Sequence, residues 1–227
     1  MRLILYKKRM RSLIVLLSLS FVCFSCAEAQ ISQPNLKKQD VEPVEVPMQN
    51  GLAKAYFASG CFWCVEAVYE SVYGVKESIS GYAGGHTQNP TYEASNTGTT
   101  GHAEAVEIIY NPEKVSFKTL VDVYFGSQNI EQVNGQGPDK GSQYRSIIFY
   151  QNEEQKQIIL DKIEALSKTY SPVAAEVMPF EKFWVAEDYH QDYKKHHPNN
   201  SYIQNVSNPR LKAFKQKFPE LLNENNR

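Results

Sequence analysis

The sequence is short of cysteine, and its few cysteines are unevenly placed. The chain has 227 residues and four cysteines, of which Cys23 and Cys26 lie near the N-terminus while Cys61 and Cys64 form a C-x-x-C pair. A pair this close in sequence closes too small a loop to stabilise a fold, so we exclude a framework of structural disulfides. A bond between Cys61 and Cys64 would be chemical rather than structural.

The sequence also lacks an excess of charge of either sign. Lys and Arg together number 24 and Asp and Glu 25, and no long basic stripe occurs in the body of the chain. No global field therefore favours nucleic acid as a partner. We expect a small molecule or a protein instead.

The apolar run near the N-terminus, over residues 13–22, is shorter than the roughly 20 residues that a membrane-spanning helix needs. It follows a cluster of Lys and Arg, a pattern typical of an export signal. We expect residues 1–29 to be this signal, cleaved after Ala29 or lipidated at Cys26, which follows a small residue. The protein would then be exported, either periplasmic or lipid-anchored to a bacterial membrane.

The composition divides the rest of the chain into three parts. Residues 30–50 are polar, contain three prolines and show no apolar periodicity, which predicts a flexible spacer. Residues 51–222 are roughly 170 residues, enough for one compact core, and we expect a single catalytic domain there. Residues 223–227 form a polar tail. We expect a monomer.

The apolar patterning of this domain alternates between strand and helix. The expected strands are 53–59, 76–82, 105–110 and 145–150, and the expected helices 61–73 and 117–124. The resulting order β-α-β-β-α-β predicts an α+β two-layer sandwich with a ferredoxin-like core. Ser116 is a candidate N-cap, as is Asn152, which begins a further helix beyond the core. We therefore expect extra C-terminal helices.

The C-x-x-C pair stands where a strand ends and a helix begins. This position places Cys61 beside unpaired backbone N–H groups and the positive end of the helix dipole, both of which favour a thiolate. Cys64 lies one helical turn later on the same face and can reach Cys61 to form a disulfide. We expect Cys61 to be the attacking nucleophile.

Two other interpretations of the pair stay open. A zinc-stabilised binding module would need two further ligands from the five histidines. No second close pair of cysteines or histidines has the spacing of a zinc knuckle. A thioredoxin-like dithiol oxidoreductase would have a different strand order. Phe62 and Trp63, between the cysteines, either pack in the core or form a pocket for a small apolar group, such as a methyl on sulfur.

Several motifs together resemble the peptide-methionine (S)-S-oxide reductases, the A class of methionine sulfoxide reductases. They occur in the family's order and extend roughly from Lys54 to His197: Gly60-Cys61-Phe62-Trp63, Gly81-Tyr82-Ala83-Gly84-Gly85, Asn89-Pro90-Thr91-Tyr92, Thr100-Gly101-His102-Ala103-Glu104, Gly141-Ser142-Gln143-Tyr144-Arg145-Ser146 and Ala186-Glu187-Asp188-Tyr189-His190-Gln191.

This resemblance implies a set of roles. Cys61 would attack the sulfur of a methionine sulfoxide, and Glu104 would deliver a proton to its oxygen. Tyr92 and Tyr144 match the family's phenols that hydrogen-bond this oxygen, and Asp139 matches its active-site aspartate. The aromatic pair after Cys61 matches the walls that hold the S-methyl group. Preference for the S epimer rests on the resemblance alone.

The chemistry agrees with these roles. A sulfoxide oxygen is a poor leaving group, so attack is easier when an acid such as a carboxyl of raised pKa protonates it. Glu104 is the best candidate, although it could also be a solvated strand-edge carboxylate. Tyr92 and Tyr144 could be ordinary packing residues in a chain with 14 tyrosines.

The chain departs from the family pattern in three places. Gln128-Asn129-Ile130 replaces the common His-Asp-Pro, no recycling cysteine follows Cys64, and Cys64 itself stands where glycine is common. We therefore expect Cys64 to resolve the Cys61 sulfenic acid into a disulfide. A thioredoxin-like dithiol protein outside the inner membrane would reduce it, and neither a metal nor an organic cofactor would be needed.

Overall fold

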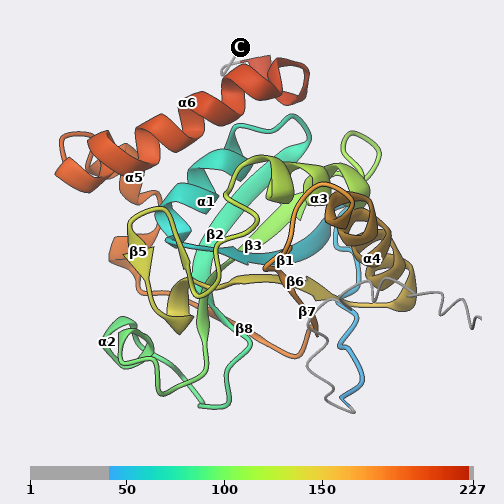
Figure 1. Ribbon diagram of the computed structural model, residues 1–227, viewed down its shortest axis with the longest axis horizontal. Coiled ribbons are helices and arrows are strands. Elements are labelled where there is room, and N and C mark those ends of the chain that lie inside the picture. The colour runs from blue at the N-terminus through green and yellow to red at the C-terminus, as the bar shows by residue number, and fades with distance from the viewer. Residues whose placement is uncertain (1–40, 225–227) are drawn as a thin grey trace, which may run out of the picture. The chain divides into compact units, whose positions relative to one another are not determined.

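The computed structural model describes residues 41–224, so the expected leader and the first part of the expected spacer lie outside the described residues. The helices and strands are β1 (Ala53–Ser59), α1 (Phe62–Glu70), β2 (Val75–Ala83), α2 (Tyr92–Asn96), β3 (Ala103–Tyr110), α3 (Phe117–Gly126), β4 (Gly135–Gln136), β5 (Asp139–Lys140), β6 (Ser146–Tyr150), α4 (Glu153–Ser167), β7 (Glu176–Pro179), β8 (Phe183–Val185), α5 (Tyr193–His196) and α6 (Asn208–Lys217) (Figure 1).

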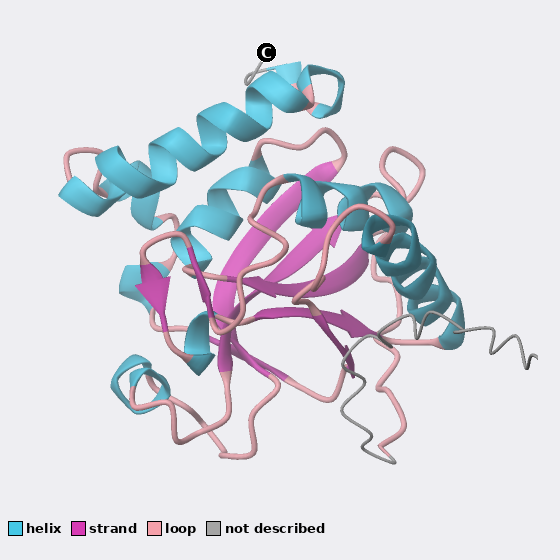
Figure 2. Ribbon diagram, in the orientation of Figure 1, coloured by secondary structure: helices cyan, strands magenta, loops and turns pink. Residues whose placement is uncertain are grey.

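Six of the strands form one sheet in the order β7-β6-β1-β3-β2-β8 (Figure 2). The neighbours pair antiparallel except β6 and β7, which are parallel. The mixed α and β class is confirmed. The ferredoxin-like arrangement stays a prediction, because β7 and β8 extend the sheet beyond the four expected strands. These two strands have only four and three residues, too few to show a clear period in the sequence.

The sheet must curl, because its two edge strands are almost consecutive in the chain. In a flat sheet, five strand spacings would separate β7 from β8 by about 24 Å. The four residue steps from Pro179 to Phe183 span at most about 14 Å. The aromatic rings of this connection fill the concave side: Phe180 stacks on Tyr56 with ring centroids 3.7 Å apart, and Phe183 lies 5.7 Å from the same ring.

Helices cover the other face of the sheet. α1 packs on β2 and β3, and α6 packs on α1 (Figure 1). α3 packs against α4. The main core lies between them, with Phe57, Val68, Leu120 and Tyr124 fully buried. Both expected N-caps are present. The Ser116 side chain accepts a hydrogen bond from the Thr119 N–H, and the Asn152 side chain accepts one from the Gln155 N–H. Within residues 41–224, no helix has the length and apolar character needed to cross a membrane.

The ordered domain begins earlier than the expected boundary at Gly51. The Val44 N–H donates to the Phe180 carbonyl at 2.7 Å, and the Val46 N–H donates to Gln151 Oε1 at 2.9 Å. Val46 also packs against the apolar cluster on the concave side of the sheet. The later part of the expected spacer, from residue 44, is therefore attached to the domain. Val44 and Val46 alone form too weak an apolar pattern, in a segment with prolines, for this attachment to be predicted from the sequence.

Candidate active site

Gly60 makes the sharp turn from β1 into α1 that presents Cys61. Its φ is +83°, a conformation that side chains disfavour, and an added Cβ would lie 2.5 Å from the Gln136 Cβ. Cys61 then occupies the N-cap position of α1 with only 7% of its surface exposed. The nucleophile expected from the sequence is thus held at the start of the helix, where the expected strand-to-helix transition occurs.

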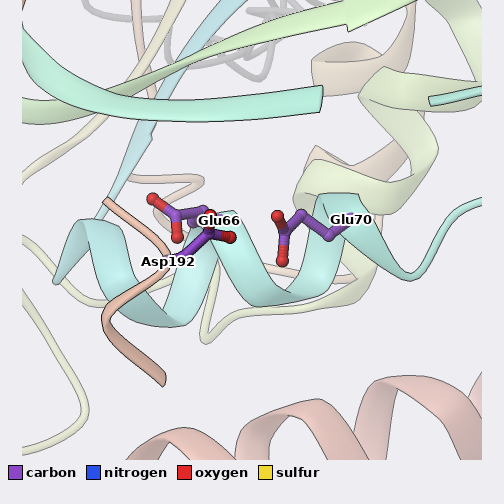
Figure 3. A group of neighbouring side chains, drawn as sticks. All are labelled: Glu66, Glu70 and Asp192. Carbon is purple, nitrogen blue, oxygen red and sulfur yellow. The ribbon is translucent and has the colours of Figure 1, made fainter. Parts of the chain in front are cut away.

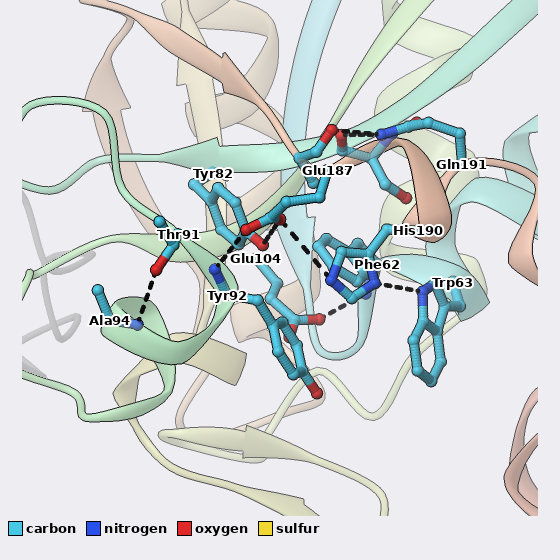
Figure 4. A network of polar contacts seen from close by, with 12 residues as sticks. Phe62, Trp63, Tyr82, Thr91, Tyr92, Ala94, Glu104, Glu187, His190 and Gln191 are labelled. Carbon is cyan, nitrogen blue, oxygen red and sulfur yellow. Dashed lines mark hydrogen bonds and ion pairs between the residues drawn. The ribbon is translucent and has the colours of Figure 1, made fainter.

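Glu104 projects from β3 toward this turn. Its Oε2 accepts the Phe62 N–H at 3.0 Å, which places the carboxyl one residue from Cys61 (Figure 4). The residue is 2% exposed. Burial raises the pKa of Glu104 to about 8, with Asp139 adding to the rise and the Phe62 N–H opposing it. The carboxyl is therefore protonated at neutral pH and can donate a proton.

The Cys61 thiolate expected from the helix terminus stays a prediction, and the surroundings of Cys61 oppose it. Burial raises the pKa of Cys61, and its hydrogen bond to Cys64 and the proximity of Glu104 raise it further. The first helical N–H, which belongs to Phe62, donates to Glu104, and the Cys61 side chain accepts no capping hydrogen bond from the helix. The hydrogen bond to Cys64 favours the protonated thiol of Cys61.

Cys64 is the more acidic of the two thiols. The hydrogen bond from Cys61 lowers its pKa to about 6, against the opposing effect of burial, and the charge of Arg210 lowers it further. Its Sγ lies 3.8 Å from Tyr202 Oη, and the Tyr202 hydroxyl donates to Asp139 Oδ2 at 2.5 Å. Asp139, a predicted site residue, is thus connected to the second cysteine through Tyr202.

Aromatic rings surround the beginning of α1 (Figure 4). The buried Phe62 ring lies 4.8 Å from His190 and 6.5 Å from Tyr92 between centroids. Trp63 donates its indole N–H to His190 Nδ1 at 3.2 Å and stacks on Tyr193 at 3.7 Å. Phe62 therefore packs in the interior while Trp63 is half-buried beside it. The aromatic faces beside Cys61 form an apolar wall held by a histidine.

Glu187 fixes the position of Tyr92. Its two carboxylate oxygens accept the Tyr92 N–H and the Tyr82 hydroxyl, each at 2.9 Å (Figure 4). His190 Nε2 lies 3.8 Å from the same carboxylate. Burial lowers the pKa of His190, so the ring is neutral, accepting from Trp63 on one nitrogen and carrying its proton on the other.

Tyr144 completes the group of residues that the sequence singled out. Its hydroxyl donates to Asn96 Oδ1 at 3.4 Å, and the same amide hydrogen-bonds Tyr92. Burial followed by the proximity of Glu104 raises the pKa of both phenols, so each is a neutral hydrogen-bond donor. The structure therefore brings together the predicted site residues around one position: Cys61, Phe62, Trp63, Cys64, Tyr92, Glu104, Asp139 and Tyr144.

A group of three carboxylates lies elsewhere, two on α1 and one just before α5 (Figure 3). Glu66, Glu70 and Asp192 are the one cluster of metal-ligand type among residues 41–224, and it contains neither cysteine nor histidine. The Lys195 ammonium pairs with Glu70 at 2.7 Å and Asp192 at 2.5 Å. Burial raises the pKa of Glu66 to about 8. A protonated acid and a lysine leave the cluster little negative charge to attract a metal.

Comparison with known proteins places this arrangement in a family. The model of the family described as peptide methionine sulfoxide reductase matches residues 53–222, almost the whole described domain. The chain belongs to this family. A peptide methionine sulfoxide reductase MsrA of Pasteurella multocida is 45% identical over 74% of this chain and 97% of its own length. One of Nautilia profundicola is 47% identical over 77% of this chain and 98% of its own length.

Solved structures of the family agree. Methionine sulfoxide reductase A of Corynebacterium diphtheriae superposes with a TM-score of 0.62 at 30% identity, covering 74% of this chain and 86% of that one. Mxr1 of Saccharomyces cerevisiae in reduced form gives a TM-score of 0.63 at 28% identity, covering 70% and 93%. Membership of the peptide methionine sulfoxide reductase family decides against the dithiol oxidoreductase and the zinc-stabilised binding module.

The sequence reasoning missed four residues that support this reductase site: Tyr82, Glu187, His190 and Tyr202. Glu187 and His190 belong to a motif that the sequence did show, but their contacts with Tyr92 and Trp63 join positions about 95 and 127 residues apart. Tyr202 lies in a polar C-terminal region with no motif of its own.

The loop that departs from the family pattern, residues 128–130, is held by Gln136. The Gln136 side chain accepts the Asn129 N–H at 2.9 Å and donates to Gln128 Oε1 at 3.1 Å.

Proposed function

We propose that this protein reduces the S epimer of methionine sulfoxide, free or in proteins, through attack of Cys61 on the sulfoxide sulfur. One observation carries the proposal: the Glu104 carboxyl, with a pKa of about 8, accepts the Phe62 N–H beside the buried Cys61. A protonated acid next to a nucleophilic thiol is what reduction of a sulfoxide requires. The family names support methionine sulfoxide as the substrate class.

The reduction step transfers one oxygen atom. The Cys61 sulfur attacks the substrate sulfur as its proton passes to Cys64, its hydrogen-bonded neighbour. The attack forms an S–S bond between Cys61 and the substrate sulfur. Glu104 protonates the sulfoxide oxygen, and the S–S and S–O bonds of the substrate sulfur then break as the hydroxyl group passes to the Cys61 sulfur. Cys61 becomes a sulfenic acid, the sulfoxide becomes a thioether, and the two electrons that reduce the substrate come from Cys61. No metal or organic cofactor is needed for this balance.

The aromatic and phenolic residues orient the substrate. Phe62 and Trp63 suit the S-methyl group, because they present apolar faces next to the nucleophile. Tyr92 and Tyr144 are neutral phenols that can donate to the sulfoxide oxygen, and their shared contact with Asn96 keeps them close together. The preference for the S epimer is inferred from the family and not from these contacts.

Cys64 completes the cycle as the resolving thiol. It attacks the sulfenic sulfur of Cys61 to form a disulfide, and the sulfenic oxygen leaves as water after taking a proton. No cysteine follows Cys64 in the sequence. A thioredoxin-like dithiol protein then reduces the Cys61–Cys64 disulfide by thiol exchange. We further propose that the catalytic domain functions as a monomer on a ferredoxin-like core.

We also propose that the protein is exported through residues 1–29. The pattern of basic residues followed by a short apolar run supports this. Expression of the full chain in a bacterium with labelled palmitate tests it. A labelled protein shows lipidation at Cys26, an unlabelled protein starting at Gln30 shows ordinary cleavage, and an unprocessed chain in the cytosol contradicts export.

Epimer-resolved reduction of methionine sulfoxide with dithiothreitol tests the proposed activity. The wild type should consume the S epimer and leave the R epimer, whereas Cys61→Ser should consume neither because serine is far too weakly acidic to replace the thiol. Circular dichroism of both proteins controls for folding. Consumption of the R epimer by the wild type contradicts the epimer assignment, and substantial turnover by a folded Cys61→Ser removes Cys61 from the mechanism.

A further inference from the structure

Arg210 on α6 holds its positive charge close to the cysteine pair. Its Nε donates to the Ser127 carbonyl at 2.8 Å, and its Nη1 and Nη2 donate to the carbonyl and the hydroxyl of Ser59, each at 2.9 Å. These three acceptors are neutral oxygens. The guanidinium is thus fixed in place by both α3 and β1, and its charge is not cancelled by these bonds.

This fixed charge lies near enough to Cys64 to lower the pKa of its thiol. Arg210, Cys64, Tyr202 and Asp139 line one cavity of about 600 Å³ between α6 and the loop after α3. An added Cβ on Gly60 would lie 3.7 Å from Arg210 Nη1, which places the guanidinium beside the turn that carries the cysteines. A nearby cation favours an anionic sulfur.

The other charged or titratable groups near Cys64 do not supply a comparable charge. Those facing it are Cys61 from α1, Glu104 from β3, Asp139 from β5, and Tyr202 with Lys217 from the C-terminal segment. Glu104 is protonated at neutral pH, and burial raises the pKa of Asp139 and of Tyr202. Lys217 lines the same cavity but is exposed, with its ammonium 3.5 Å from the Gly126 carbonyl.

We propose that Arg210 is a positioning residue that holds Cys64 in its anionic form for attack on the Cys61 sulfenic acid. This inference rests on the proposed resolving role of Cys64. Cys64 first passes the proton that it took from Cys61 to the Glu104 carboxylate. The Cys64 thiolate then forms the S–S bond as the S–O bond of the sulfenic acid breaks, and the departing hydroxide takes that proton from Glu104 to become water. The sulfenic sulfur is reduced and the thiolate sulfur is oxidised, so no external oxidant is needed.

Two substitutions separate the charge of Arg210 from its anchoring bonds. Arg210→Gln removes the charge but keeps an N–H donor for Ser59. Arg210→Lys keeps the charge but loses the planar fork that bonds Ser59 and Ser127 together. Both variants should lower the melting temperature, because each weakens the attachment of α6. Only the loss of charge should change the ionisation of Cys64.

The ionisation of Cys64 is measured by thiolate absorbance near 240 nm, in a full-length chain with Cys23, Cys26 and Cys61 replaced by serine. In this background, Arg210→Gln should raise the titration midpoint of Cys64 by about one pH unit, the scale expected for loss of a nearby opposite charge. Arg210→Lys should leave it near that of the parent. An unchanged midpoint in folded Arg210→Gln, or an equal rise in both variants, overturns the proposal.

Disulfide formation distinguishes this proposal from the function on which it rests. With Cys61 present, the Cys61–Cys64 disulfide that forms after one equivalent of sulfoxide is followed by mass spectrometry across pH. The midpoint of its rate should move to higher pH in Arg210→Gln and stay in place in Arg210→Lys. A wild type that forms no such disulfide contradicts the resolving role itself. A disulfide that forms with an unchanged pH profile in Arg210→Gln contradicts only the role of Arg210.

Discussion

The Phe62 N–H donates to Glu104 Oε2 at 3.0 Å, joining the first turn of α1 to the middle strands of the sheet. The Cys61 side chain, at the N-cap of this helix, accepts no capping hydrogen bond. The bond to Phe62 holds the Glu104 carboxyl one residue from Cys61. The helix terminus thus serves the acid more directly than the nucleophile.

Replacing Glu104 tests the proton donor. Glu104→Gln should keep the fold, because the amide oxygen can still accept the Phe62 N–H, but it should lower the reduction rate by about 10²-fold or more, the usual scale for a general acid. Single-turnover reduction of methionine S-sulfoxide measures the rate, and thermal melting controls for stability. A rate close to that of the wild type would assign the proton to another group, with Tyr92 or Tyr144 next.

The pH profile tests the ionisation of the same acid. Because the pKa of Glu104 is raised to about 8, the donor form predominates at neutral pH and is lost as the pH rises through about 8. The single-turnover rate of the wild type should therefore fall on the alkaline side near that pH. A glutamine amide does not titrate in this range, so this limb should be absent in Glu104→Gln. An identical alkaline limb in both proteins would rule out Glu104 as its source.

Removing the two phenol hydroxyls tests their role at the sulfoxide oxygen. Tyr92→Phe and Tyr144→Phe should each slow the single-turnover reduction by about tenfold, as expected for one hydrogen bond that strengthens in the transition state. Tyr189→Phe is a matched control, since Tyr189 is 54% exposed. Full activity of Tyr92→Phe and Tyr144→Phe would show that the two residues serve packing only.

Gly81→Ala tests the curled sheet and its connection to the site. An added Cβ would lie 2.3 Å from the carbonyl of Trp184 and from the Phe183 ring, so β8 must move away from β2. We expect a loss of about 1–3 kcal/mol in the free energy of unfolding. Activity should also fall, because β8 leads to Glu187, which holds Tyr92. Unchanged melting and activity would mean that β8 has no role in the site.

Local patterns predicted the local structure well. The turn at Cys61, the cap at Ser116 and the start of the helix after Asn152 depend on residues within a few positions of one another. The curl of the sheet could not be predicted in this way. It arises because β7 pairs with β6 at one edge of the sheet and β8 pairs with β2 at the other. Pairing between distant segments leaves little trace in so short a strand.

The candidate site shows the same difference between local patterns and contacts of distant segments. The motifs identified the residues that lie together around Cys61, but the ionisation of the cysteines depends on partners far away in the chain. Glu104 lies 42 residues from Phe62, Tyr202 lies 138 residues from Cys64, and Arg210 lies 151 residues from Ser59. The bond between Glu104 and the start of α1 could not be predicted for this reason, since a helix terminus is visible in the sequence but the group that bonds to it is not.

Cys64→Ser tests the central claim most directly, because it separates attack from recycling. The variant should still reduce one equivalent of methionine S-sulfoxide, more slowly than the wild type because the proton acceptor of Cys61 is lost. It should leave a sulfenic acid at Cys61 that dimedone traps. Turnover driven by thioredoxin should collapse, since thioredoxin attacks a disulfide, while a small thiol should sustain some turnover. Wild-type turnover with thioredoxin in Cys64→Ser would contradict the account, because the enzyme would then be recycled without the Cys61–Cys64 disulfide.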